Sequence, residues 1–228
     1  LIGCTASNMT TSKQSRISVQ VDSYGNDSGL EKRNCFLYAA DTLINTNDLQ
    51  YEEFYGYLKK IFTYKGYNVV ESIESANIII FFNYGISDPK TYEYTKSIPV
   101  WGQTGVTSTT TTGNAYVDPY TNNVTYRQKT TNRPTYGVKG YRTVSGNYTA
   151  YLRYINFIAF DFEYYSKTKK EKRIWQTSVT SEGNSDDLRY IFPYMLVGAY
   201  KYIGNSSGEQ KEIILYENDA NVQKLKGQ

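Results

Sequence analysis

Two acidic residues, Asp161 and Glu163, are the side chains whose type and spacing come nearest to a catalytic pair. They lie in residues 151–165, where β-branched and aromatic residues predict a long strand. Residues two apart on one strand face would hold their carboxylates roughly 6–7 Å apart, a separation that suits acid–base chemistry on sugars. A carboxylate-dependent glycan hydrolase is therefore one hypothesis. Alternating acids are far commoner as plain strand surface, so we predict that the protein is not an enzyme.

Histidine is absent, and the sequence has only two cysteines, Cys4 and Cys35. The chain therefore lacks the commonest general base and the commonest metal ligand. Two cysteines without histidine cannot complete a thiolate zinc site unless carboxylates contribute heavily. Cys35 lies in residues 34–40, a predicted strand, and we expect a buried, unreactive thiol there. We expect neither a metal site nor a cofactor.

The first four residues, Leu1-Ile2-Gly3-Cys4, resemble a bacterial lipobox, in which a cysteine that receives diacylglycerol follows two aliphatic residues and a small one. We predict lipidation of Cys4, including palmitate or a similar acyl chain, because a cysteine with several acyl chains anchors stably to a membrane. The alternative is an ordinary surface cysteine. Residues 5–14 are small and polar and predict a flexible tether. Residues 1–15 would then be lipobox remnant, acylation site and tether, and residues 16–228 one domain.

The charge of the chain is nearly balanced. Among 228 residues, 25 are Lys or Arg and 22 are Asp or Glu, which gives a net charge of +3. Nucleic-acid binding proteins usually carry a concentrated basic face, so we expect no nucleic-acid partner. The apolar runs are far shorter than the ~20 residues that a spanning helix requires. Membrane contact is therefore expected through the lipid on Cys4.

An amphipathic helix is predicted over residues 48–65. Phe54, Leu58 and Ile61 recur at the spacing of one helix face. Asn47 or Asp48 can cap its start, and Gly66 stands where a left-handed C-terminal cap is wanted.

A second helix is predicted at about residues 187–202, and the apolar run 78–82 predicts a strand covered on both faces. The expected fold class is α+β: a mainly antiparallel β-sheet with two principal helices packed on one face and an extended Tyr/Thr-rich β-hairpin region. Trp175 is expected in the core.

That hairpin region, residues 97–150, is predicted as an insertion in the domain. Aromatic and β-branched residues recur there among Thr, Asn and Gly, and several Lys and Arg residues are interleaved. Such a mixture can bind glycan or single-stranded nucleic acid, although a solvated strand face is commoner. Tyrosine offers a large contact area at little entropic cost. The candidate contacts for a partner or a glycan are Trp101, Tyr116, Tyr120, Tyr126, Tyr136 and Tyr141.

Several short motifs in a fixed order carry a family resemblance. The motifs are the apolar helix followed by Lys65-Gly66-Tyr67, the segment Pro99-Val100-Trp101-Gly102, the strand with Asp161, Trp175 in its partner strand, and residues 185–194. Together with the lipobox they resemble uncharacterised bacterial lipoproteins of the DUF4136-like kind, over residues 16–216. The resemblance implies an α+β domain anchored to the outer membrane and facing the periplasm or the cell surface. It implies no catalytic residues.

The expected function is therefore that of a membrane-anchored bacterial lipoprotein. It would act as a structural or protein-binding component of the cell envelope, within a larger periplasmic or outer-membrane complex. Its expected partners are the membrane and other envelope proteins. The alternatives are a glycan- or peptidoglycan-binding module and the carboxylate-dependent hydrolase.

Overall fold

The computed structural model describes residues 15–25, 33–41, 44–119, 121 and 123–227. It divides into two compact units. We call the unit formed by residues 1–90 and 149–228 the body, and the unit formed by residues 91–148 the arm. Strand is more abundant than helix and most strand pairs are antiparallel, which confirms the predicted mixed α and β class. The predicted lipidation site Cys4 and the candidate contact Tyr120 lie outside the described residues.

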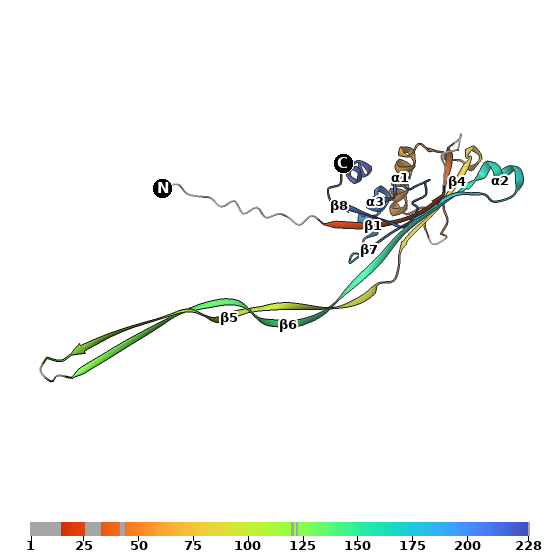
Figure 1. Ribbon diagram of the computed structural model, residues 1–228. Coiled ribbons are helices and arrows are strands. Elements are labelled where there is room, and N and C mark those ends of the chain that lie inside the picture. The colour runs from red at the N-terminus through yellow and green to blue at the C-terminus, as the bar shows by residue number, and fades with distance from the viewer. Residues whose placement is uncertain (1–14, 26–32, 42–43, 120, 122, 228) are drawn as a thin grey trace, which may run out of the picture. The chain divides into compact units, whose positions relative to one another are not determined.

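The strands form a sheet in the order β3-β2-β4-β6-β7-β1-β8, with β5 paired to β6 (Figure 1). The pairs of β2 with β3 and with β4 are parallel, and β1–β7, β1–β8, β4–β6 and β6–β7 are antiparallel. The strands are β1 Arg16–Gly25, β2 Asn34–Ala39, β3 Asn68–Val69, β4 Ile78–Ile86, β5 Lys90–Val117, β6 Val124–Asp161, β7 Arg173–Gly183 and β8 Lys211–Tyr216.

Helix α1, Leu49–Tyr64, connects β2 to its parallel neighbours, because parallel strands require a crossover. Its start is fixed by Asp48, whose side chain accepts a hydrogen bond from the backbone N–H of Gln50 at 3.3 Å. Just beyond its end, Gly66 has φ +86°, the left-handed conformation that glycine adopts easily. Both ends agree with the prediction.

The other helices are α2 Phe162–Thr168, α3 Leu188–Ala199, α4 Ala220–Lys226 and the short 3-10 helix η1 Ile73–Ser75. Helix α3 begins after Asp187, whose carboxylate accepts from the N–H of Tyr190 at 3.0 Å. It ends before the predicted boundary at residue 202. Helices α2 and α4 were not predicted.

The single strand expected over residues 151–165 is wrong at its end. Strand β6 stops at Asp161, and the backbone turns at once into α2. The carbonyl oxygen of Asn77 accepts the N–H groups of Phe162 and Glu163 at 2.8 and 3.2 Å, which holds the first turn of the helix. The alternation of apolar and polar residues could not predict where the strand ends, because its end depends on this tertiary contact.

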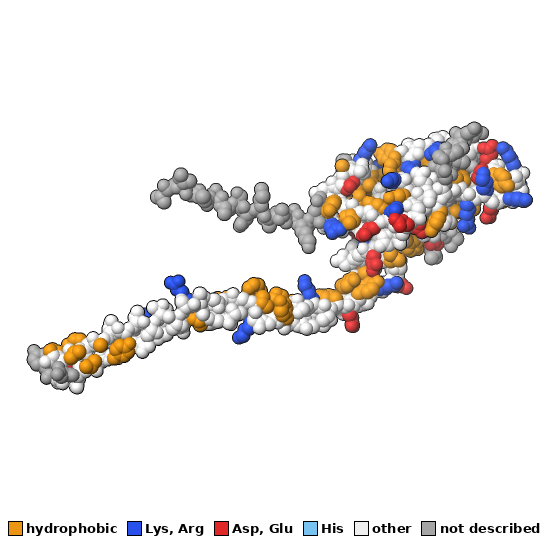
Figure 2. Space-filling view, viewed as in Figure 1, with side chains coloured by type: hydrophobic (Ala, Val, Ile, Leu, Met, Phe, Trp, Pro, Cys, Tyr) orange, Lys and Arg blue, Asp and Glu red, His pale blue; other side chains and the backbone are white. Residues whose placement is uncertain are grey.

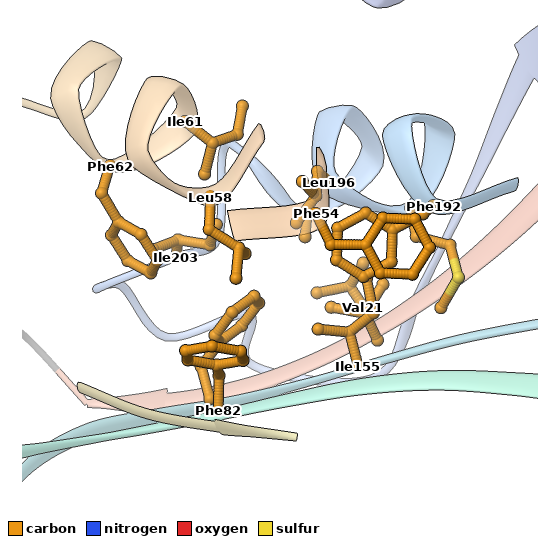
Figure 3. Close-up of a cluster of buried hydrophobic side chains, with 14 of the residues drawn as sticks. Val21, Phe54, Leu58, Ile61, Phe62, Phe82, Ile155, Phe192, Leu196 and Ile203 are labelled. Carbon is orange, nitrogen blue, oxygen red and sulfur yellow. The ribbon is translucent and has the colours of Figure 1, made fainter. Parts of the chain in front are cut away.

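Helices α1 and α3 cover one face of the sheet and enclose the core (Figure 3). Phe54 of α1 and Phe192 of α3 stack with ring centroids 4.0 Å apart and planes nearly parallel, and both are fully buried. Beneath them lie Val21 of β1 and Ile155 of β6. The core also contains Trp175, as predicted, and its indole N–H donates to the hydroxyl of Tyr67 at 2.9 Å.

One arginine is buried in the body. Arg153 of β6 donates from Nε to the carbonyl of Ser181 at 3.0 Å and from Nη1 to the carbonyl of Ser185 at 2.8 Å. Burial lowers the pKa of its guanidinium, while the charge of Glu182 opposes this effect. A methyl group on Gly183 would collide with this guanidinium. The absence of a side chain there gives the arginine its space.

Within the described part of the chain, no helix has both the length and the apolar character needed to cross a bilayer.

Replacement of Phe54 by Ala tests the importance of the stacked pair. We expect Phe54→Ala to lower the free energy of unfolding by about 3–5 kcal/mol, because a buried ring is lost and a cavity remains. Leu49→Ala in the same helix is the control, since Leu49 is 80% exposed, and it should change stability by less than about 0.5 kcal/mol. Urea unfolding followed by circular dichroism measures both free energies of unfolding. Equal losses of stability in the two variants would contradict the importance of the stacked pair.

Candidate functional site

The arm is a two-stranded hairpin, made by residues 91–117 of β5 and 124–148 of β6 (Figure 1). At its tip, the N–H of Asp118 donates to the carbonyl of Asn123 at 2.9 Å. No second layer of structure packs on the hairpin within the described residues of the arm. Almost all of its side chains are therefore exposed.

The candidate contacts that the structure describes are all open to solvent. Their exposed fractions run from 62% for Tyr126 to 72% for Tyr136, with Trp101 at 70%. Hydrophobic side chains gather at the tip and recur along the arm (Figure 2). The cluster at the tip consists of Tyr116, Val117, Val124 and Tyr126.

Alternation along β6 sorts the side chains of the outer arm, residues 101–117 and 124–139, into two faces. Contacts between the strands give the matching residues of β5: the hydroxyls of Thr111 and Thr130 lie 3.4 Å apart, and Thr104 lies beside Gly137. One face, which we call the charged face, carries Arg127, Lys129, Arg133 and Lys139. The other, which we call the neutral face, carries threonines and no charged residue, together with Trp101, Val117, Val124, Tyr126, Tyr136 and Val138.

The candidate residues are therefore not one cluster. Trp101, Tyr126 and Tyr136 share the neutral face, whereas Tyr116 belongs to the charged face. Closer to the body, Tyr92 stacks on Tyr148 with ring centroids 5.3 Å apart. The arrangement suits an extended contact with a neighbour.

The body has a pocket that sequence analysis missed. It has a volume of about 500 Å³ and lies on the sheet face opposite the core formed with α1 and α3. Ile79 and Phe81 of β4, and Ile158 and Phe160 of β6, form its floor. Phe81 and Phe160 meet edge to face at 5.5 Å. Such a lining can receive an apolar group.

The expectation that β4 is covered on both faces is therefore wrong for part of the strand. Ile78, Ile80 and Phe82 enter the core, whereas Ile79 and Phe81 face the open pocket. An unbroken apolar run does not distinguish these two environments. The short helix α2, whose Phe162 and Tyr165 line one side of the pocket, was not predicted, and without it the pocket could not be predicted either.

Asp161 and Glu163 do not form the carboxylate pair expected from strand geometry, because Glu163 lies in α2. Asp161 caps this helix by accepting from the N–H of Tyr164 at 2.9 Å, and it also accepts from Lys172 at 3.0 Å. Glu163 accepts from Lys167 at 2.8 Å and from Asn77 at 3.3 Å. Through these contacts both carboxylates stabilise α2.

The titratable groups whose pKa values rise to about 12 lie in the core or pack against it. Burial raises the pKa of Cys35 to about 12, in agreement with the expected unreactive thiol. Burial is also the main reason that the pKa values of Tyr55, Tyr84 and Tyr194 rise to about 12. Among the described residues, no group of three or more His, Cys, Asp or Glu side chains is placed to hold a metal ion.

Comparison with known proteins found one weak structural similarity. No protein-family model matches the chain, and no curated protein matches it. Among solved structures, it is similar to a PDZ domain protein from Parabacteroides distasonis, with a TM-score of 0.37 and 12% sequence identity. The similarity covers 88% of this chain and 39% of that one. A likeness this weak carries no argument about function.

Substitution of Asp161 tests its capping role in α2. We expect Asp161→Ala to lower the free energy of unfolding by about 1 kcal/mol, because α2 loses the acceptor for its first turn. Glu171→Ala is the control, since Glu171 is exposed near the same pocket and should be close to neutral. Chemical denaturation measures both, and an unchanged stability for Asp161→Ala would contradict the capping role.

The raised pKa values predict a loss of stability in alkali. Between about pH 9, where an exposed thiol ionises, and about pH 12, the folded protein keeps protons on Cys35 and the three tyrosines that the unfolded chain releases. The free energy of unfolding should therefore fall as the pH rises through this range. Urea unfolding at about pH 8 and about pH 11 measures the fall. In Cys35→Ala the fall should be smaller, and an equal fall would show that the thiol contributes nothing.

Proposed function

We propose that this protein is a lipid-anchored component of the bacterial cell envelope that binds other envelope proteins through its arm. In this proposal the body, with two principal helices on one sheet face, is the scaffold, and the Tyr/Thr-rich hairpin is the binding element. The motifs that resemble DUF4136-like lipoproteins support a place at the outer membrane, facing the periplasm or the cell surface.

The observation that carries the proposal is the exposure of the arm. An isolated two-stranded hairpin is at best marginally stable in water, since each strand has only one neighbour and no layer covers it. Here such a hairpin extends over β5 and most of β6 with its aromatic side chains exposed. A binding partner would supply the missing contacts. Tyrosine and tryptophan suit this role because they bury much area with few rotatable bonds.

The anchor in this proposal is the lipid on Cys4. The lipobox-like Leu1-Ile2-Gly3-Cys4 and the polar residues up to β1 support it. A lipid of several acyl chains would hold the protein at the membrane for long periods, because each buried methylene adds to its affinity for the bilayer. The proposed partner would then be another protein of the same compartment.

Glycan binding is the second candidate. Trp101 and Tyr136 expose their rings on the neutral face among threonine hydroxyls, and aromatic rings beside hydroxyl groups suit sugar rings. In that case the protein would be a peptidoglycan- or glycan-binding module with the same anchor. It would be extracted as a monomer that is retained by purified cell-wall glycan.

A shortened arm tests the proposal. Residues 101–139 are replaced by an Asn-Gly turn, which closes a hairpin with two residues. After gentle detergent extraction from its own membrane, we expect the parent protein to run as a large complex and the shortened variant as a monomer. The native mass measures this difference, and the unfolding transition of the variant verifies that its body is folded.

Two outcomes would contradict the proposal. A parent protein that leaves the membrane without detergent, as Cys4→Ser is expected to do, would refute the lipid anchor. A shortened variant that keeps the large complex would refute the arm as its binding element.

A further inference from the structure

The outer arm keeps all of its charge on one strand and on one face. Arg127, Lys129, Arg133 and Lys139 all belong to β6, at alternate positions that share the charged face. Facing them on β5 are neutral side chains, with Thr104 and Gly102 beside the β6 residues Gly137 and Lys139. The arm therefore has a basic strand and a neutral strand.

The outer edge of β5 has none of the usual protection against pairing. Strands at the edge of a sheet are commonly guarded by charges, prolines or bulges that prevent further strands from adding. Residues 100–117 of β5 contain no Lys, Arg, Asp, Glu or Pro, and β-branched threonines are frequent among them. In the described part of the arm, β5 pairs only with β6, so this edge remains open over about 55 Å.

We infer that the partner of the arm is a second copy of this chain, and that the copies join edge to edge, with β5 of one arm paired to β6 of the next. This inference rests on the proposed function, since it names the envelope protein that the arm binds. The contact adds a main-chain hydrogen-bond ladder to each arm on either side of Pro134 of β6, which has no N–H to donate. It gives each strand of the hairpin a second neighbour.

Charge selects this pairing over β6 with β6. If two β6 strands met, their rows of arginine and lysine would lie side by side, and like charges on neighbouring strands are destabilising. When β6 meets β5 of the next copy, its cations lie beside neutral side chains such as Ser108, Thr110 and Thr112. Each basic strand is then separated from the next by a neutral one.

Symmetry and the anchor disfavour pairing of β5 with β5. If two β5 strands were related by a two-fold axis along the strands, the neutral face of one arm and the charged face of the other would lie on the same side of the joined sheet. A two-fold axis through the sheet would keep the faces together, but it would point the two bodies in opposite directions. Copies anchored by Cys4 in one membrane share a direction. Pairing of β5 with β6 keeps both the faces and the direction, and such a head-to-tail contact can close into a ring.

Cross-linking of two variants, each with one added cysteine, tests the pairing. Thr110→Cys marks β5, and Thr131→Cys marks β6 on a tagged copy; both positions are exposed threonines on the charged face. The two full-length proteins are produced together in their own membrane and treated with a flexible bismaleimide. We expect a product of one tagged and one untagged chain, at least tenfold above the homodimers of either variant. Ser206→Cys, an exposed position on the body, is paired with Thr131→Cys to measure random collisions.

Every outcome decides the inference. Homodimers of Thr110→Cys would show β5–β5 pairing, homodimers of Thr131→Cys would show β6–β6 pairing, and either would overturn it. The absence of any product above the Ser206→Cys level would also overturn the inference. If a large complex still depends on the arm in that case, the proposed function stands and the partner is a different protein.

The parent protein, treated alone, reports on the anchor. Cys35 is buried, so a cross-linked parent would mean that Cys4 has a free thiol and that the lipid anchor of the proposed function is wrong. The pairing would then be tested with the same variants in a Cys4→Ser background, which keeps the two questions separate.

Discussion

The body depends on the contact between Phe54 and Phe192, which joins its two main helices over the sheet. Helix α1 belongs to the parallel crossover near one side of the sheet, whereas α3 packs chiefly on β1 and β7. The stacked rings close the core between these two halves, above Ile155 of β6. The two residues are far apart in sequence, so their contact joins distant parts of the chain.

The two faces of the sheet have different chemistry because the principal helices α1 and α3 cover only one of them. On the covered face, apolar side chains exclude water, and the pKa values of Cys35 and Tyr84 rise accordingly. On the other face, the pocket floored by Ile79 and Phe81 remains open, and Asn83 and Asn156 pair through their side chains at 3.0 Å. The same strands thus alternate between a dry interior and an accessible surface.

Local signals predicted those elements whose ends are set locally. Asp48 and Gly66 mark both ends of α1, and the apolar stripe between them identifies its buried face. Helix α2 was not predicted because its own residues continue the alternation of the preceding strand. Its first turn is held by the carbonyl of Asn77, which is distant in sequence. The pocket escaped because an unbroken run of apolar residues has no alternation to show which side is open. The exposed aromatic residues of the arm were identified, but their division between two faces required contacts between the strands.

The run of threonines in β5 has a consequence for how the arm can change over generations. From Thr107 to Thr112 every side chain is a threonine or a serine, and each lies beside neutral or basic residues of β6. Insertion or loss of two residues in each strand would keep every remaining side chain on its own face, because the alternation of a strand repeats every two residues. The reach of the arm would change by about 6–7 Å at each such step. The length of the arm could therefore change while the body keeps its sequence.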